Sequence, residues 1–249
     1  MANTTFFVLS IILFVIGIPL FIMGFIWLKQ KRLIENIPTS KIRSLAMGLV
    51  EVYGKVVSWQ GTMLKSPMTN RDCVYYKYTI EEYRKSGKHS HWVTIKKDVG
   101  SLHFNLQDET GKVLVNPKGA KIDIPRDFEF KSGFGKDPPI SVKQFLKINN
   151  LRFEGSLFGF NKTMRFRESF IEPSDKLYIM GTAGDNPFVD DATTKKGVED
   201  VLIQKGKHDK FYYISDKSEH EVLKALKGKV VFGIGLGSIF IIIGLIGLL

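Results

Sequence analysis

Long apolar runs lie at the two ends of the chain, and the segment between them alternates between apolar and polar residues. Residues 1–28 and 230–249 carry no ionisable side chain. A helix needs about 20 mostly apolar residues to cross a bilayer core, and it satisfies its own backbone hydrogen bonds inside lipid. We therefore predict transmembrane helices over residues 6–28 and 230–249. A buried core helix is the alternative for either run, and a cleaved signal peptide is a second alternative for the first.

Basic residues flank both runs on the sides that face the middle of the chain. No Lys or Arg precedes the first run, and no charged side chain follows the second. Because Lys and Arg next to a span favour the cytoplasmic side, we predict a two-span protein of the cell membrane with a cytoplasmic middle domain and both termini outside. The residues predicted to lie at the membrane interface are Trp27, Lys29, Lys31, Arg32, Lys227 and Lys229.

Two glycines in the second run have the spacing of a helix-packing motif. Gly233 and Gly237 form a G-x-x-x-G pattern, which lets another helix approach closely in a membrane. The first span is the nearest candidate partner, and a second copy of the chain, which would make a homo-oligomer, is the other. The alternative is that glycine is simply common in membrane helices.

The middle of the chain has the residue pattern of a β-rich domain. Residues 29–43 predict a basic connector, broken by Pro38, and residues 44–227 predict a single domain large enough to bury its own core. Alternation predicts strands near 48–57, 73–83, 92–95, 104–106, 113–115, 164–171, 177–181 and 211–214. Helices are expected at 141–148 and from Ser218 into the second span. The predicted fold is a membrane-anchored, β-rich α+β domain between two transmembrane helices.

Three local signals refine this pattern. A glycine inside the first predicted strand indicates a bulge. The turn residues at 172–175 predict that the strands on either side of them form a hairpin. Ser218 and Glu221 have the spacing of a capping box, which predicts the start of the last helix.

The formal net charge of +11 lies entirely between the two apolar runs. A basic domain held at a membrane is attracted to anionic lipid headgroups, by about 1 kcal/mol for each Lys or Arg near the surface. Nucleic acid is a competing partner for a basic protein, and a merely well-solvated surface is a third interpretation. Because acidic residues are interspersed and no aromatic RNA-binding signature occurs, we expect membrane lipids and an unidentified protein as partners, and no nucleic acid.

Residues with catalytic or metal-binding chemistry are sparse. The single cysteine, Cys73, is expected to pack as a small hydrophobe, because a catalytic thiol needs a base beside it. His89 and His91 would share a strand face and could bind a metal with His103, but a surface pair is the simpler interpretation. No phosphate-binding glycine loop and no ordered nucleophile–base set occurs. We therefore predict no catalytic, cofactor-binding or metal-binding residue.

Two polar loops are the predicted partner-binding regions, because binding residues concentrate on loops. They are a hairpin tip at 84–88 and a loop at 185–200. The candidate partner-binding residues are Arg84, Lys85, Lys88, Asp185 and Asp190.

Five segments in order resemble the GIDE domain, also called BAM ("beside a membrane"), of membrane-anchored E3 ubiquitin ligases. They are GLVEVYGKV (48–56), SPMTNRDCVYYKYTIEEY (66–83), FNLQDETGKVLVNPKGA (104–120), ESFIEPSDKLYIMG (168–181) and YISDKSEHEVLKALK (213–227). In the mitochondrial ligases of this family, a RING finger follows the second span and the domain lies in the intermembrane space. The chain is similar to prokaryotic members of the family, and we expect an archaeal one.

A RING finger holds two zinc ions with eight Cys or His ligands, whereas this sequence has one Cys and five His. We therefore expect a family member without the RING. The predicted function is a membrane-tethered protein-interaction or scaffold module at the inner face of the membrane. The alternatives are a component of ubiquitin-like protein transfer, as the E3 resemblance implies, and an accessory protein that binds anionic lipid.

Overall fold

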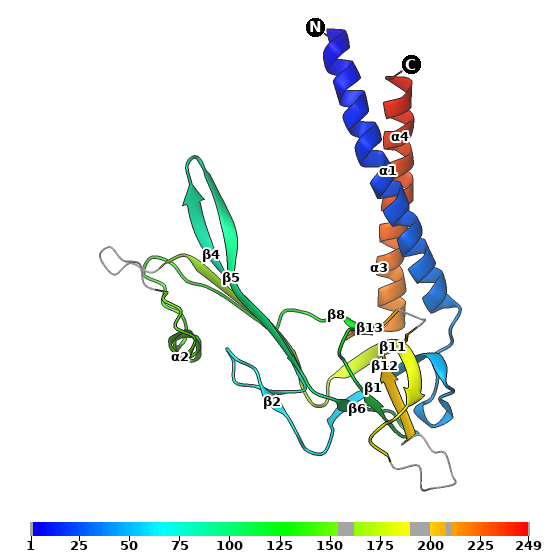
Figure 1. Cartoon of the computed structure of the whole chain (residues 1–249), viewed down its shortest axis with the longest axis vertical. Helices are drawn as coiled ribbons and strands as arrows, with labels where there is room; N and C mark the ends of the chain where they lie inside the picture. The colour runs from blue at the N-terminus through cyan, green and yellow to red at the C-terminus, as the bar shows by residue number, and fades with distance from the viewer. Residues whose placement is uncertain (1, 154–161, 190–199, 208–210, 249) are drawn as a thin grey trace. The chain divides into compact units, whose positions relative to one another are not determined.

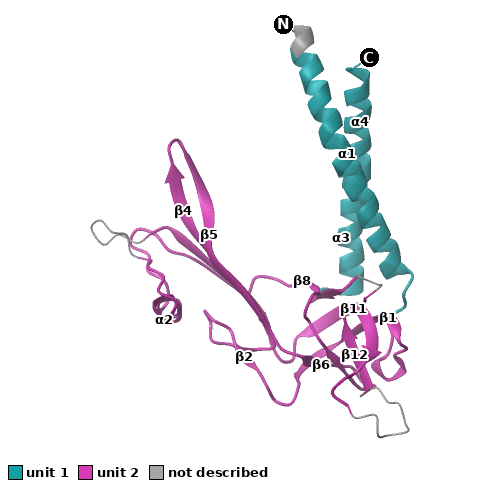
Figure 2. Cartoon of the chain, in the orientation of Figure 1, with its two compact units in different colours: residues 1–39, 217–249 teal, residues 40–216 magenta. Residues whose placement is uncertain are grey.

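The computed structural model of the chain describes residues 2–153, 162–189, 200–207 and 211–248. It contains two compact units, which are coloured separately in Figure 2. The terminal unit comprises residues 1–39 and 217–249, and the middle unit comprises residues 40–216. Residues 217–227, which the sequence pattern placed with the middle domain, group with the terminal helices in the structure.

The terminal unit is a pair of long helices (Figure 1). Helix α1 spans Ala2–Glu35, and the second helix is continuous through α3 (Glu219–Val231), the π-helical turn η3 (Phe232–Leu236) and α4 (Gly237–Ile246). Both are long and apolar enough to cross a membrane. Helix α1 continues through residues 29–35 of the predicted connector, where Lys31 and Glu35 pair at 2.5 Å one turn apart.

The predicted capping box at the start of the last helix is confirmed. The Ser218 hydroxyl accepts a hydrogen bond from the Glu221 backbone N–H, and the Glu221 carboxylate accepts one from the Ser218 N–H at 2.9 Å. These two bonds satisfy donors that the first helical turn would otherwise leave unpaired. They fix the start of α3 one residue after Ser218.

Glycines bring the two terminal helices into close contact within one chain. A Cβ added to Gly24 would lie 2.6 Å from the Ile234 backbone nitrogen, and one added to Gly237 would lie 2.7 Å from the Phe21 nitrogen. Gly233 likewise faces Gly24. The G-x-x-x-G pair therefore packs against the first span of the same chain, as small residues do in membrane helix pairs. A homo-oligomer through Gly233 and Gly237 stays a prediction.

The first part of the middle unit is a seven-stranded sheet that curls back on itself. Its order is β1-β6-β7-β12-β11-β13-β8, and β1 also pairs with β11. The strands are β1 (Gly48–Ser58), β6 (Phe104–Gln107), β7 (Lys112–Val115), β8 (Lys121–Asp123), β11 (Lys176–Asp185), β12 (Val201–Gln204) and β13 (Tyr213–Ser215). Alternate side chains of these strands, such as Val50 and Val52, form a buried core that Ile42 of the short helix η1 (Ile42–Ser44) joins.

Gly54 does not mark a bulge. The pairing of β1 with β11 runs without interruption through Gly54 and Leu177. A Cβ at Gly54 would lie 2.6 Å from the Gln107 backbone oxygen of β6. The glycine is needed because two backbones approach closely here, which is the other role of glycine inside a strand.

The second part of the middle unit is a four-stranded antiparallel sheet of order β5-β4-β10-β9. Its strands are β4 (Tyr75–Ser86), β5 (His89–Ser101), β9 (Phe128–Lys131) and β10 (Met164–Ile171). Helix α2 (Ile140–Ile148) packs on one face through Val142 and Leu146, which form a second core with Tyr78, Ile80 and Phe166. A small hairpin, β2 (Leu64–Lys65) with β3 (Asp72–Cys73), precedes β4.

The predicted hairpin around residues 172–175 is wrong. Strand β10 pairs with β4 and β9, whereas β11 pairs with β1, β12 and β13. The turn, in which Ser174 has a φ of 84°, therefore leads the chain from one sheet to the other. A turn sequence predicts a reversal of the chain but does not specify which strands pair after it.

Candidate functional site

The face of the four-stranded sheet that lies opposite α2 is lined by charged and hydroxyl side chains. Neighbouring residues on paired strands share a face, and the register sets Lys77 opposite Ser169, Thr79 opposite Arg167 and Glu81 opposite Arg165. Glu129 of β9 pairs with Arg167 from the other side. We call this surface the charged face. It comprises Lys77, Thr79, Glu81, Glu129, Lys131, Arg165, Arg167 and Ser169.

Ion pairs order the arginines of the charged face. Glu81 lies 2.8 Å from Arg165 Nε and 3.2 Å from an Arg167 terminal nitrogen. Glu129 pairs with Arg126, whose hydrogen bond lowers the pKa of the Glu129 carboxyl. The Arg165 guanidinium also lies 4.3 Å from the centre of the Trp92 ring, at a distance typical of a cation–π contact. Glu81 and Glu129 thus pair with Arg165, Arg167 and the adjacent Arg126, which leaves this surface with excess positive charge.

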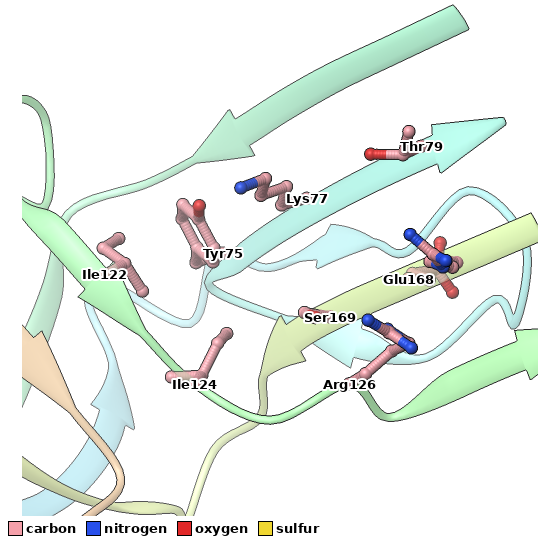
Figure 3. Close-up of a pocket in the computed structure, with 9 residues that line it drawn as sticks. Tyr75, Lys77, Thr79, Ile122, Ile124, Arg126, Glu168 and Ser169 are labelled. Carbon is pink, nitrogen blue, oxygen red and sulfur yellow. The ribbon is translucent and has the colours of Figure 1, made fainter. Parts of the chain in front are cut away.

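A cavity of about 280 Å³ opens at the end of the charged face nearest β8 (Figure 3). Figure 3 shows the labelled side chains grouped around it, from β4, from β10 and from the segment that begins with β8. The lining residues are Tyr75, Lys77, Thr79, Ile122, Ile124, Arg126, Arg167, Glu168 and Ser169. Cationic and hydroxyl groups therefore surround most of the cavity, and two isoleucines form its apolar side.

Some nitrogen donors of the residues that line the cavity have no hydrogen-bond partner among the described residues. Arg167 Nε is buried and has no hydrogen-bond partner among the described residues, and its distance to Glu129 is 3.6 Å. The exposed Lys77 pairs with none of the described side chains. Because Lys77, Arg126 and Arg167 line the cavity, it favours a ligand that carries negative charge and accepts hydrogen bonds.

Glu168 of β10 is a buried carboxylate that connects the four-stranded sheet to the segment before β4. It is 1% exposed and lies on the same face of β10 as Phe166, which packs in the core with α2. Its carboxylate accepts hydrogen bonds from the Met68 N–H at 2.8 Å, from the Thr69 N–H at 3.1 Å and from the Thr69 hydroxyl at 2.6 Å. Because both carboxylate oxygens accept these bonds, Glu168 ties β10 to the segment that contains Met68 and Thr69.

The predicted partner-binding residues lie on two different sheets. Arg84, Lys85 and Lys88 are exposed at the predicted tip of the β4–β5 hairpin, and Arg84 pairs with Glu82 at 2.8 Å. Asp185 ends β11, opposite Val201 of β12. Asp190 lies outside the described residues. The structure does not bring the hairpin tip and Asp185 into one site.

The residues predicted for the membrane interface all lie on the terminal helices. Trp27, Lys29, Lys31 and Arg32 are on α1, and Lys227 and Lys229 are on α3. Trp27 packs beside Gly233: a Cβ added to Gly233 would lie 3.0 Å from the indole ring of Trp27. Their position relative to a bilayer, and the orientation of the chain, stay predictions.

Sequence reasoning missed an aromatic cluster. Trp59, His103 and Phe188 lie with ring centres 5.0 to 5.7 Å apart, and Phe188 is exposed. Burial lowers the pKa of the His103 imidazole. The described residues contain no group of three metal-binding side chains, so His89, His91 and His103 do not come together there. Only tertiary pairing brings these aromatic residues together.

Cys73 is buried, and burial raises the pKa of its thiol to about 12. A thiol is unreactive until it ionises, so we expect a soluble thiol reagent at pH 8 to label the native chain very slowly. Labelling should become fast once the middle unit is unfolded in urea. Fast labelling of the native chain would show that Cys73 is accessible. The full chain has one cysteine, so this reaction also reports the integrity of the fold in any variant.

Comparison with known families identifies the relatives of the chain. The family model named GIDE, described as E3 ubiquitin ligase, matches residues 75–248. This range includes the charged face, its cavity and the second terminal helix. No curated protein and no solved structure matches the chain. Since the match covers well over half of the sequence, the chain belongs to the GIDE family of E3 ubiquitin ligase-related proteins.

Proposed function

We propose that this GIDE-family chain is a membrane-tethered protein-interaction module at the inner face of the membrane. Its binding site would be the charged face, whose cavity would receive an acidic side chain of a partner protein. The single observation that carries this proposal is the cavity lined by the three cationic side chains Lys77, Arg126 and Arg167.

The chemistry of the cavity favours a carboxylate on a protein. Arginine binds carboxylates through charge-assisted hydrogen bonds, and a hydrogen bond to a charged group contributes about 1.5 to 3 kcal/mol. Ile122 and Ile124 also line the cavity and would contact the methylene groups of an acidic side chain. At about 280 Å³ the cavity lies at the lower end of the size of ligand sites, which suits a side chain better than a large cofactor.

Site-specific photo-crosslinking in native membranes tests this proposal. A photoreactive residue at Thr79 should yield a defined crosslinked product, and Lys77→Glu should abolish it by placing a negative charge in the cavity. The matched control is a photoreactive residue at Lys112, an exposed position on β7 outside the cavity. The same products at both positions, or a Thr79 product that survives Lys77→Glu, would contradict the proposal.

Participation in ubiquitin-like protein transfer is the second candidate function, because the matching family is described as E3 ubiquitin ligase. The 249 residues hold one Cys and five His, too few for the eight ligands of a RING finger. These residues would therefore act by recruiting a substrate or another transfer component. Conjugates that form with activating and conjugating enzymes only when the chain is present would support this function. Equal conjugation without the chain would rule it out.

A further inference from the structure

Helix α2 has apolar residues on both sides. Val142 and Leu146 face the four-stranded sheet and are buried. Ile140 and Ile148 are 76% and 80% exposed. Successive residues of an α-helix turn by about 100°, so positions 140, 144 and 148 lie along the side opposite the buried pair. The solvent side of α2 thus carries an exposed isoleucine at each end with Gln144 between them, and we call these three positions the isoleucine stripe.

The turn before α2 adds a third exposed apolar side chain. Phe134 is 81% exposed and lies in the turn closed by the Gly133–Lys136 bridge. Gly135 in this turn has a φ of 66°, a conformation that glycine adopts easily and that permits the tight reversal. We call Phe134, Ile140, Gln144 and Ile148, with Lys143 and Lys147, the α2 docking surface.

The segment around this surface is strongly basic. Residues 132–153 contain four basic side chains, Lys136, Lys143, Lys147 and Arg152, and a single acidic one, Asp137. Lys143 and Lys147 lie on α2 itself, beside the isoleucine stripe. Asp137 pairs with Lys143, so most of the positive charge is not neutralised by an acidic residue of this segment.

We propose that the α2 docking surface binds an anionic lipid surface, with Ile140, Ile148 and Phe134 entering the headgroup boundary. Exposed apolar side chains ringed by lysines are the features of helices that lie in a membrane interface. Lysine stems can lie along apolar surface while their ammonium groups reach lipid phosphates and carboxylates. This binding is independent of the protein site on the charged face.

Charge favours lipid over a protein as the occupant. An isoleucine stripe alone fits either occupant, but the four cations of this segment match a surface of uniform negative charge. The chain also carries two helices that are long and apolar enough to cross a membrane. Such anchors would keep lipid at a high effective concentration around the middle unit, so that even weak docking becomes populated.

Fluorescence of the full chain in lipid nanodiscs tests the proposal. A Gln144→Cys variant would be labelled with an environment-sensitive dye, since Cys73 is buried and protected. We expect a blue shift and a several-fold rise in emission in discs that contain phosphatidylserine, relative to phosphatidylcholine alone. High salt should reverse part of this change, because it screens exposed charges. A label at Lys112→Cys on β7 is the matched control and should show no lipid dependence.

Combined variants separate the apolar and charged contributions. Ile140→Asn with Ile148→Asn should abolish the blue shift, and Lys143→Gln with Lys147→Gln should remove its dependence on phosphatidylserine. Slow labelling of Cys73, measured in the same variants without Gln144→Cys, would show that they remain folded. Emission at Gln144→Cys that is identical in both lipids would overturn the proposal. So would a blue shift that appears only when a soluble protein is added, which would identify the occupant as a protein.

Discussion

Replacing Glu168 by alanine is expected to destabilise the middle unit by about 3 kcal/mol, because hydrogen bonds to a buried charged acceptor are lost. The carboxylate is 1% exposed and accepts three hydrogen bonds from Met68 and Thr69. Its removal leaves the buried Met68 N–H without this acceptor. The urea dependence of Cys73 labelling measures the effect, since Cys73 begins to react when this region opens.

The control for Glu168→Ala is Glu168→Gln. Glutamine has nearly the same shape and keeps one acceptor oxygen, so it should lose less stability than alanine does. Equal labelling of the wild type and both variants in urea would show that the Glu168 hydrogen bonds do not hold the segment at residues 66–70 to the sheet.

Replacing Gly54 by alanine is the second change expected to have a large effect. The new Cβ would lie 2.6 Å from the Gln107 backbone oxygen, a separation that neither strand can relieve by rotating a side chain. Overpacking of this kind costs about 1 to 3 kcal/mol and occasionally more. We expect a value at the upper end, measured as a lower urea midpoint for Cys73 labelling.

Gly184→Ala is the matched control for Gly54→Ala. Gly184 is also a strand glycine, but the nearest atom to an added Cβ is the Gln204 side-chain nitrogen at 3.7 Å. This variant should keep the stability of the wild type within about 0.5 kcal/mol, as most uncrowded substitutions do. If the two alanine variants were equally stable, close strand approach would not be the reason for glycine at position 54.

Local patterns in the sequence predicted the elements that depend on neighbouring residues. The terminal helices follow from two uncharged runs, and the start of α3 follows from Ser218 and Glu221. The β4–β5 hairpin follows from alternation up to a polar tip that contains Gly87. For each of these elements, the residues that predict it lie within the element itself or next to it in the sequence.

The candidate site could not be predicted in this way because it depends on pairing between distant strands. Thr79 and Arg167 become neighbours only because β10 pairs with β4 instead of forming a hairpin with β11. Trp59, His103 and Phe188 come together for a similar reason. The sequence pattern instead indicated exposed loops, because polar turn residues are visible without knowledge of the pairing.

The central claim is that the charged face binds an acidic segment of a partner protein. Its most direct test is the affinity of the full chain in nanodiscs for the partner that crosslinks at Thr79. We expect Lys77→Glu to weaken binding at least tenfold, about 1.4 kcal/mol, whereas Lys112→Glu, the same charge reversal outside the cavity, should leave the dissociation constant unchanged. Equal dissociation constants for the wild type and Lys77→Glu would contradict the claim.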